Sequence, residues 1–92
     1  MIVKIDFGMH EEFIDIADEL EEQIEQLQRE FLDWLYNKEI DHQYWIYKDG
    51  SKWGVSYRSS AFIEWLNNKI TVSKESILLE GNQFSSVRTI YF

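Results

Sequence analysis

A run of apolar residues between positions 13 and 34 is spaced alternately four and three apart, and this leaves few folds open to the chain. The run consists of Phe13, Ala17, Leu20, Ile24, Leu27, Phe31 and Trp34. Residues at these spacings share one face of an α-helix, so the pattern predicts a long amphipathic helix from about His10 to Lys38. Such a helix would be roughly 40 Å long. Because this exceeds the diameter of a compact domain of 92 residues, we expect part of the helix to overhang or to meet a partner.

Alternating apolar and polar residues, or short aromatic runs bounded by turn residues, predict strands elsewhere in the chain. These segments are residues 3–7, 44–47, 53–57, 76–80 and 84–91. The last two would be joined at Gly81 and Asn82. After the third, Ser59 or Ser60 can cap a short helix from Ala61 to about Asn67.

Asp49 and Gly50 separate the two aromatic segments, and an Asp-Gly pair favours a tight hairpin turn. A two-residue turn would place Ile46 opposite Trp53. A three-residue turn would shift this pairing and change which aromatic side chains are neighbours.

Together these elements predict a single α+β domain over residues 1–92. The elements would follow the order β-α-β-β-α-β-β and include a mostly antiparallel sheet of about 4–5 strands. One long acidic amphipathic helix and one short helix would cover one face of this sheet.

Composition excludes several classes of function. The chain has no cysteine, which excludes disulfides and thiol catalysis and is typical of a reducing compartment, so we expect a cytoplasmic location. Seventeen acidic and nine basic residues give a net charge of −8, which argues against direct binding to nucleic acid. No apolar run approaches the roughly 20 residues of a membrane-spanning helix, so we expect no membrane contact.

The negative charge is concentrated in the first 40 residues, which hold twelve acidic and three basic side chains, against five and six in the remainder. Eight acids and no base lie between Glu11 and Glu25. On a helix most of them would face away from the apolar stripe and form a continuous acidic face. Each pair of like charges four positions apart destabilises a helix by about 0.2–0.5 kcal/mol. The absence of lysines therefore needs an explanation other than helix stability.

Two explanations stay open: a solvated surface that keeps copies of the protein apart, or a docking surface for a basic partner protein. The second makes the chain a non-enzymatic protein-binding module of the inhibitor or immunity type. Its partner-binding face would comprise Glu11, Asp15, Asp18, Glu19, Glu22 and Glu25. An alternative is a phage-type DNA mimic, in which regularly spaced carboxylates imitate phosphates and occupy a nucleic-acid-binding protein.

The apolar stripe and the aromatic residues predict two further candidate surfaces. The stripe could form the seam of a structural homodimer, or it could pack on the chain's own sheet. The candidate seam residues are Leu20, Ile24, Leu27 and Phe31. Trp45 and Tyr47 are candidates for an exposed aromatic patch that binds protein. A wider set also resembles a platform for single-stranded nucleic acid, although the net charge favours a core or cross-strand role. This set adds Trp53, Tyr57, Lys48, Lys52 and Arg58 to the same two residues.

No residue pattern indicates an enzyme or a cofactor site. His10 and His42 are the only histidines, and neither lies in a metal-binding motif. The carboxylates of the long helix would face water, which leaves them poorly tuned for acid–base catalysis. The serines lack the context of a nucleophile elbow, and the four glycines form no phosphate-binding loop. We therefore expect no catalytic residue, no metal and no cofactor.

Overall fold

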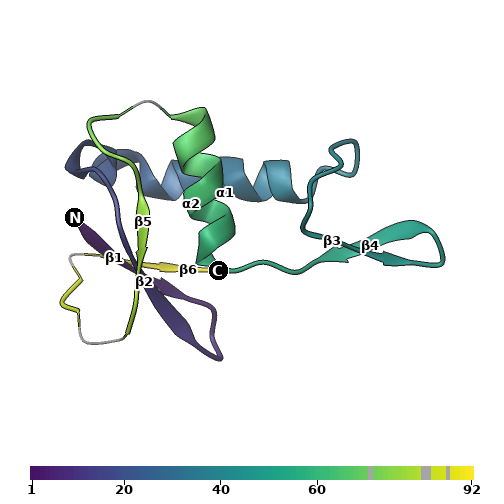
Figure 1. The fold of residues 1–92 in the computed structure, drawn as a ribbon, viewed down its shortest axis with the longest axis horizontal. Helices are drawn as coiled ribbons and strands as arrows, with labels where there is room; N and C mark the ends of the chain where they lie inside the picture. The colour runs from purple at the N-terminus through teal and green to yellow at the C-terminus, as the bar shows by residue number, and fades with distance from the viewer. Residues whose placement is uncertain (71, 82–83, 87) are drawn as a thin grey trace.

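The computed structural model describes residues 1–70, 72–81, 84–86 and 88–92, and this part of the chain contains six strands and two helices (Figure 1). A six-residue 3-10 segment, η1, continues directly into the twelve-residue helix α1. The elements in chain order are β1 (Ile2–Asp6), β2 (Glu11–Asp15), η1 (Asp18–Gln23), α1 (Ile24–Leu35), β3 (Trp45–Lys48), β4 (Ser51–Val55), α2 (Ser59–Lys69), β5 (Ile77–Leu79) and β6 (Arg88–Tyr91). The predicted α+β class is confirmed.

The strands lie in two sheets. Four of them form one sheet in the order β5-β2-β1-β6, and β3 and β4 form a separate hairpin. β1 pairs antiparallel with β2 and parallel with β6, while β5 pairs antiparallel with the other side of β2. The mostly antiparallel pairing is therefore confirmed, and the strands of the described residues exceed the predicted number by one.

The prediction of one helix from about His10 to Lys38 is wrong in its first part, because residues 11–15 form strand β2. Gly8 adopts a φ of +88°, a conformation that only glycine reaches without steric penalty. The N–H of Phe7 donates to the carbonyl of His10 at 2.9 Å, so the chain reverses here and β2 returns along β1.

The four-residue spacing from Phe13 to Ala17 fits a helix, but Phe13 lies in strand β2 and its side chain is buried there. Phe13 packs against Phe84, with 5.7 Å between ring centroids, while its neighbour Ile14 joins the core under the helices. Successive side chains of a strand point to opposite faces, so both can be buried in a sheet. The helical part begins only at Asp18.

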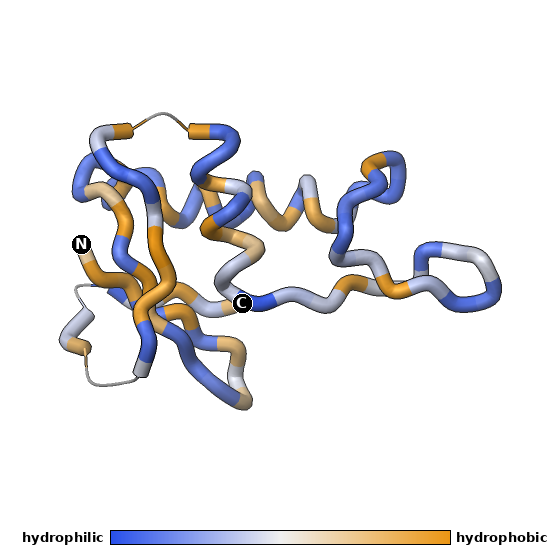
Figure 2. Tube along the Cα trace, viewed as in Figure 1, coloured by the Kyte–Doolittle hydropathy of each residue, from blue (hydrophilic) through white to orange (hydrophobic). Residues whose placement is uncertain are grey.

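One hydrophobic core joins the two helices to the four-stranded sheet. Apolar and polar residues alternate along α1 and α2 in Figure 2, and the apolar faces of both helices meet the buried residues of β1, β2 and β6. The core includes the whole candidate dimer seam, each residue at most 3% exposed: Leu20, Ile24, Leu27 and Phe31. The dimer-seam interpretation is therefore wrong, because the sheet and α2 of the same chain already bury these side chains.

Phe31 lies at the centre of the core. Its ring centroid lies 5.2–6.1 Å from those of five other aromatic rings. These rings belong to Trp34, Tyr57, Phe62, Trp65 and Phe92. One side chain of α1 thus contacts α2, the segment that leads into α2 and the residue that follows β6.

β3 and β4 form the predicted hairpin, which projects from the body of the molecule on the right of Figure 1. Asp49 and Gly50 have φ angles of 53° and 80° and form a two-residue turn, the first of the two alternatives that the sequence left open. A bulge follows, so that Gly54 rather than Trp53 lies opposite Ile46.

The later elements differ from prediction in their limits and pairing. α2 begins at Ser59 and extends to Lys69, beyond the expected end. β5 and β6 lie at opposite edges of the sheet, so they do not form a hairpin with each other. Of the predicted turn and strand, Asn82 and Val87 lie outside the described residues.

The position of Phe31 predicts the effect of shortening its side chain. Replacement by leucine (Phe31→Leu) should lower the free energy of unfolding by about 1–3 kcal/mol, because it removes ring contacts from a closed core. Urea unfolding of wild type and variant measures this difference. Both midpoints should stay constant over a roughly hundred-fold range of protein concentration. A midpoint that rises with concentration would show that folding is coupled to self-association, which contradicts a core closed within one chain.

Candidate protein-binding site

The six residues predicted as an acidic face lie on different elements. Glu11 and Asp15 belong to β2, whereas Asp18, Glu19, Glu22 and Glu25 lie on η1 and the first turn of α1. The chain changes from strand to helix between the two groups, so the carboxylates do not form one continuous row. Glu11 is also paired with Lys4 of β1 at 2.8 Å. The prediction of a continuous acidic face on one helix is therefore wrong.

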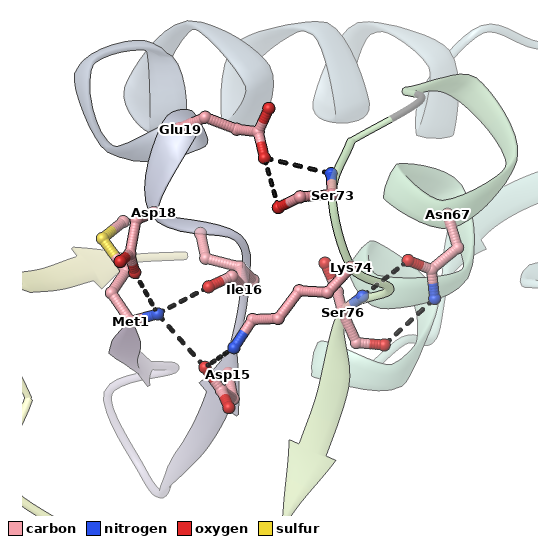
Figure 3. A network of polar contacts seen from close by, with 9 residues as sticks. All are labelled: Met1, Asp15, Ile16, Asp18, Glu19, Asn67, Ser73, Lys74 and Ser76. Atoms are coloured by element: carbon pink, nitrogen blue, oxygen red, sulfur yellow. Dashed lines mark hydrogen bonds and ion pairs between the residues drawn. The ribbon is translucent and has the colours of Figure 1, made fainter.

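Asp15 takes part in a network of polar contacts at the end of β2 (Figure 3). Its Oδ1 accepts hydrogen bonds from Lys74 Nζ at 2.9 Å and from the Met1 amine at 3.2 Å. The same amine donates to the Ile16 carbonyl at 2.6 Å and to the Asp18 carboxylate at 2.8 Å. The hydrogen bond from Lys74 lowers the pKa of Asp15; burial opposes this effect, and the Met1 amine reinforces it. Asp15 thus holds the segment before β5 against β2.

Two further polar contacts fix the same segment (Figure 3). The Glu19 carboxylate accepts hydrogen bonds from the N–H and the hydroxyl of Ser73, at 3.0 and 2.5 Å, and these bonds lower the pKa of Glu19. Asn67 of α2 exchanges two hydrogen bonds with the backbone of Ser76, at 3.0 and 2.8 Å. The carboxylate of Glu19, predicted to face a partner, therefore accepts its hydrogen bonds from Ser73 of the same chain.

Glu12, which is outside the predicted acidic face, holds the first turn of α2. Its Oε1 accepts hydrogen bonds from the backbone N–H of Ser59 at 3.1 Å and from the Ser59 hydroxyl at 2.7 Å. Ser59 is fully buried, and the N-cap residue Arg58 makes no capping bond with its side chain. A carboxylate here satisfies a free N–H and interacts favourably with the positive end of the helix dipole. Glu12 lies on a strand that is distant in the sequence, and it thus takes the capping role that was predicted for a serine.

The accessible remainder of the acidic face lies around the start of α1. Glu21, Glu22 and Glu25 are exposed. Glu25 lies 3.7 Å from Arg88 and keeps 69% of its side chain exposed. Glu21 and Glu22 make no ion pair with any of the described residues. Glu22, from the predicted face, and its neighbour Glu21 can therefore be reached without breaking an ion pair, whereas Glu25 would exchange its contact with Arg88.

Trp45 and Tyr47, predicted as an exposed patch, have different surroundings. Trp45 is only 8% exposed: its Nε1 donates to the Ile40 carbonyl at 2.6 Å, and its ring stacks on His42 with 4.9 Å between centroids. Lys52 Nζ lies 5.4 Å from the centroid of the same ring. Trp45 thus anchors the root of the hairpin, and its prediction as an exposed residue is wrong. Tyr47, two residues further out, is 56% exposed.

Two large apolar side chains are exposed on the opposite face of the hairpin. Trp53 is 66% exposed and Ile46 is 39% exposed. Lys48 Nζ lies 5.6 Å from the Trp53 ring centroid, and Ile46, two residues before Lys48, points to the same side. Sequence reasoning named Trp53 only as part of the aromatic-and-basic platform and did not select Ile46, because it could not tell which face of the hairpin the body of the molecule would cover. The one local indication of the bulge was Gly54, because a glycine inside a strand often marks one.

A pocket of about 390 Å³ lies between the end of α1, the loop before β3, and α2. Its lining residues are Trp34, His42, Gln43, Tyr44, Ala61, Glu64, Trp65, Asn68 and Lys69. The Tyr44 hydroxyl donates to Glu64 Oε2 at 2.8 Å; burial raises the pKa of Tyr44, and this carboxylate raises it further. Sequence reasoning missed the pocket, because its residues come from three segments that only the tertiary packing brings together.

His42 forms part of the pocket wall in a defined protonation state. Its Nδ1 accepts the backbone N–H of Tyr44 at 3.1 Å, and its Nε2 lies 2.7 Å from the carbonyl of Leu35. A backbone N–H only donates and a carbonyl only accepts, so the ring is the neutral tautomer with its proton on Nε2. His42 therefore adds no positive charge to the pocket.

Comparison of the chain with protein families, curated proteins and solved structures finds no match. Among the described residues, no group of three or more His, Asp or Glu side chains is arranged to hold a metal ion. Neither helix of this part of the chain has the length and apolar content that crossing a bilayer requires. The site must therefore be interpreted from its own geometry.

The contacts of two neighbouring glutamates predict a larger loss of stability for one substitution than for the other. Glu12→Ala should lower the free energy of unfolding by about 0.5–2 kcal/mol, because it removes the acceptor of the first turn of α2. Glu11→Ala, the matched control, removes only an exposed ion pair and should change it by less than about 1 kcal/mol. Chemical denaturation measures both, and equal losses would contradict the capping role of Glu12.

The lowered pKa of Asp15 predicts a loss of stability in acid. A carboxylate whose pKa is lower in the folded state than the ordinary value of about 3.9 stabilises the fold above that value. This contribution disappears as pH falls through the folded-state pKa. Asp15→Asn should therefore destabilise the protein at neutral pH and make progressively less difference as the pH falls below the ordinary value for aspartate. Urea unfolding at several pH values tests this, with Glu21→Gln as the control that lacks a described partner. A constant difference between wild type and Asp15→Asn would count against the interpretation.

Proposed function

We propose that the chain is a non-enzymatic protein-binding module of the inhibitor or immunity type that acts on a partner with a basic surface. The projecting hairpin contacts the partner, and the acidic residues guide the encounter. In this proposal the contact surface is the hairpin and not the acidic face that the sequence predicted. The partner is still expected to be basic.

The exposure of Trp53 and Ile46 on a projecting hairpin carries this proposal. Neither hairpin strand pairs with another sheet in the described part of the chain. A two-stranded hairpin is only marginally stable by itself, and this one is held on one face only, by Trp45 at its root and by Lys52, whose Nζ contacts the Ile40 carbonyl at 3.3 Å and the carboxylate of Asp41. Exposed apolar side chains that gather on such an arm are typical of an interaction site, and tryptophan is the residue most enriched at the energetic centre of interfaces.

The charge distribution favours a basic partner. A net charge of −8 attracts a positively charged protein over several Ångströms of solvent, and the acidic residues need not enter the final contact to do so. Glu21, Glu22 and Glu25 are free to contribute to this field. Steering of this kind raises the association rate more than it raises the final affinity.

The DNA-mimic alternative receives less support from the geometry. It needs carboxylates at regular intervals along one rod. The change from β2 to η1 interrupts such a row, and internal contacts engage Glu11, Asp15 and Glu19. Docking through the hairpin does not depend on that spacing.

The proposal predicts that partner binding depends on the tip of the hairpin. Affinity capture from the native host at low and moderate salt would identify the partner, and purified partner would then be titrated. Trp53→Ser should weaken binding by at least about 30-fold, the effect of losing a central interface tryptophan. The fold should persist, because this side chain is outside the core. Retention of full affinity by Trp53→Ser would contradict the proposal.

Two matched variants separate docking from steering. Ile77→Ser removes a similarly exposed apolar side chain from β5, away from the hairpin, and should leave binding unchanged. Glu21→Gln combined with Glu22→Gln should slow association and reduce its dependence on salt, with little change in dissociation. An unchanged association rate would show that these acids only solvate the surface.

A further inference from the structure

The pocket between α1, the loop before β3, and α2 has several aromatic side chains in its walls. Three of its lining residues, Trp34, Tyr44 and Trp65, are large aromatic side chains from three different segments. Trp34 contacts His42 with 4.6 Å between ring centroids, and Trp65 contacts Phe31 with 5.8 Å. Trp65 is also buried. The core therefore holds these walls in place before any ligand arrives.

A carboxylate lies among the aromatic rings. Glu64 Oε2 accepts hydrogen bonds from the Tyr44 hydroxyl at 2.8 Å and from Gln43 Nε2 at 3.4 Å. The second oxygen of Glu64, Oε1, has no hydrogen-bond partner among the residues that the structure describes. Aromatic faces attract cations, and a carboxylate oxygen with free lone pairs adds a charge-assisted hydrogen bond. The pocket is thus suited to a positively charged group.

The size and lining of the pocket favour the side chain of arginine. A volume of about 390 Å³ admits a single side chain rather than a folded segment. A guanidinium group is planar and weakly hydrated, stacks on aromatic rings and pairs with a carboxylate, whereas the lysine ammonium is compact and strongly hydrated. Gln43 and Asn68 in the lining carry amide oxygens that can accept the remaining N–H groups.

The other titratable side chains of the lining decide how strongly a cation is held. His42 is neutral in this structure, so it does not repel a cation. Lys69 lies in the last turn of α2 and is exposed, and its flexible stem allows the ammonium to turn toward water. Its charge nevertheless disfavours a cationic ligand. Replacing Glu64 and replacing Lys69 should therefore change the affinity in opposite directions.

We infer that this pocket receives an arginine side chain of the partner protein, stacked on its aromatic walls and paired with Glu64. The inference rests on the proposed function, because it assumes a basic protein as the partner. It adds a second contact that is distinct from the exposed apolar side chains of the hairpin.

The pocket can be tested without the partner. A short capped peptide, acetyl-Gly-Arg-Gly-amide, would be titrated into the full chain while the indole N–H signals of Trp34 and Trp65 are followed by NMR. The matched control is the same peptide with citrulline, a neutral isostere of arginine. The arginine peptide should bind at least about ten-fold more tightly than the citrulline peptide.

Three variants fix the sign of the ligand charge. Glu64→Gln keeps an acceptor for Tyr44 but loses the negative charge, and it should weaken arginine binding about ten-fold. Lys69→Gln should strengthen binding about two-fold to five-fold. Glu75→Gln, which removes an exposed acid outside the lining, should change nothing. Unfolding curves of all three variants establish that the fold is intact.

Several results would overturn the inference. These are equal binding of the arginine and citrulline peptides, equal or tighter binding of a lysine peptide, and no saturable shift at millimolar peptide. Weaker binding after Lys69→Gln would also overturn it, because this would indicate an anionic ligand.

The titration with the partner protein separates the two proposals. If Trp53→Ser loses the partner and Glu64→Gln does not, the hairpin interface stands and the arginine pocket fails. The reverse result would retain the pocket and reject the hairpin.

Discussion

Phe31 packs where α1 meets α2 and where the residue after β6 returns to the core, and several other features take their positions from this contact. Aromatic side chains remove about 150–250 Å² each from water, at about 25 cal/mol for each Å² of apolar surface. The total stability of a domain of this size is only about 5–15 kcal/mol, so such a cluster is a large part of what holds the fold. The same cluster orients Trp34 and Trp65, which form walls of the pocket.

The acidic run near the amino terminus is explained in part by the internal roles of its carboxylates. Glu12 holds the start of α2, Asp15 pairs with Lys74, and Glu19 accepts two hydrogen bonds from Ser73. Each contact joins β2 or η1 to a segment far along the chain. Exposed ion pairs contribute little free energy individually. The N–H and the hydroxyl of Ser59 are buried, so losing the Glu12 acceptor would leave them unsatisfied at a larger cost. The contacts of Asp15 and Glu19 are exposed and mainly specify where the segment before β5 lies.

The hairpin and the pocket share a structural root. His42 lies between the two, with its ring 4.9 Å from Trp45 of the hairpin and 4.6 Å from Trp34 of the pocket wall. Its two nitrogens engage the backbone of Tyr44 and Leu35, so the ring is fixed from both sides. One partner could therefore contact an apolar arm and insert a basic side chain beside it, because both features are attached to the same rigid support.

Features that depend on residues near each other in the chain could be read from the residues alone. The Asp49–Gly50 turn, the helix that contains Phe31 and the short helix α2 all have local causes in backbone preference and apolar spacing. The strand at residues 11–15 could not be recognised, since its apolar spacing also fits a helix and pairing with β1 decides between them. Composition likewise determined the net charge, but tertiary packing decided which carboxylates reach water. The burial of Trp45 and the exposure of Trp53 have the same origin: exposure depends on which distant segment covers a face, and no local pattern carries that information.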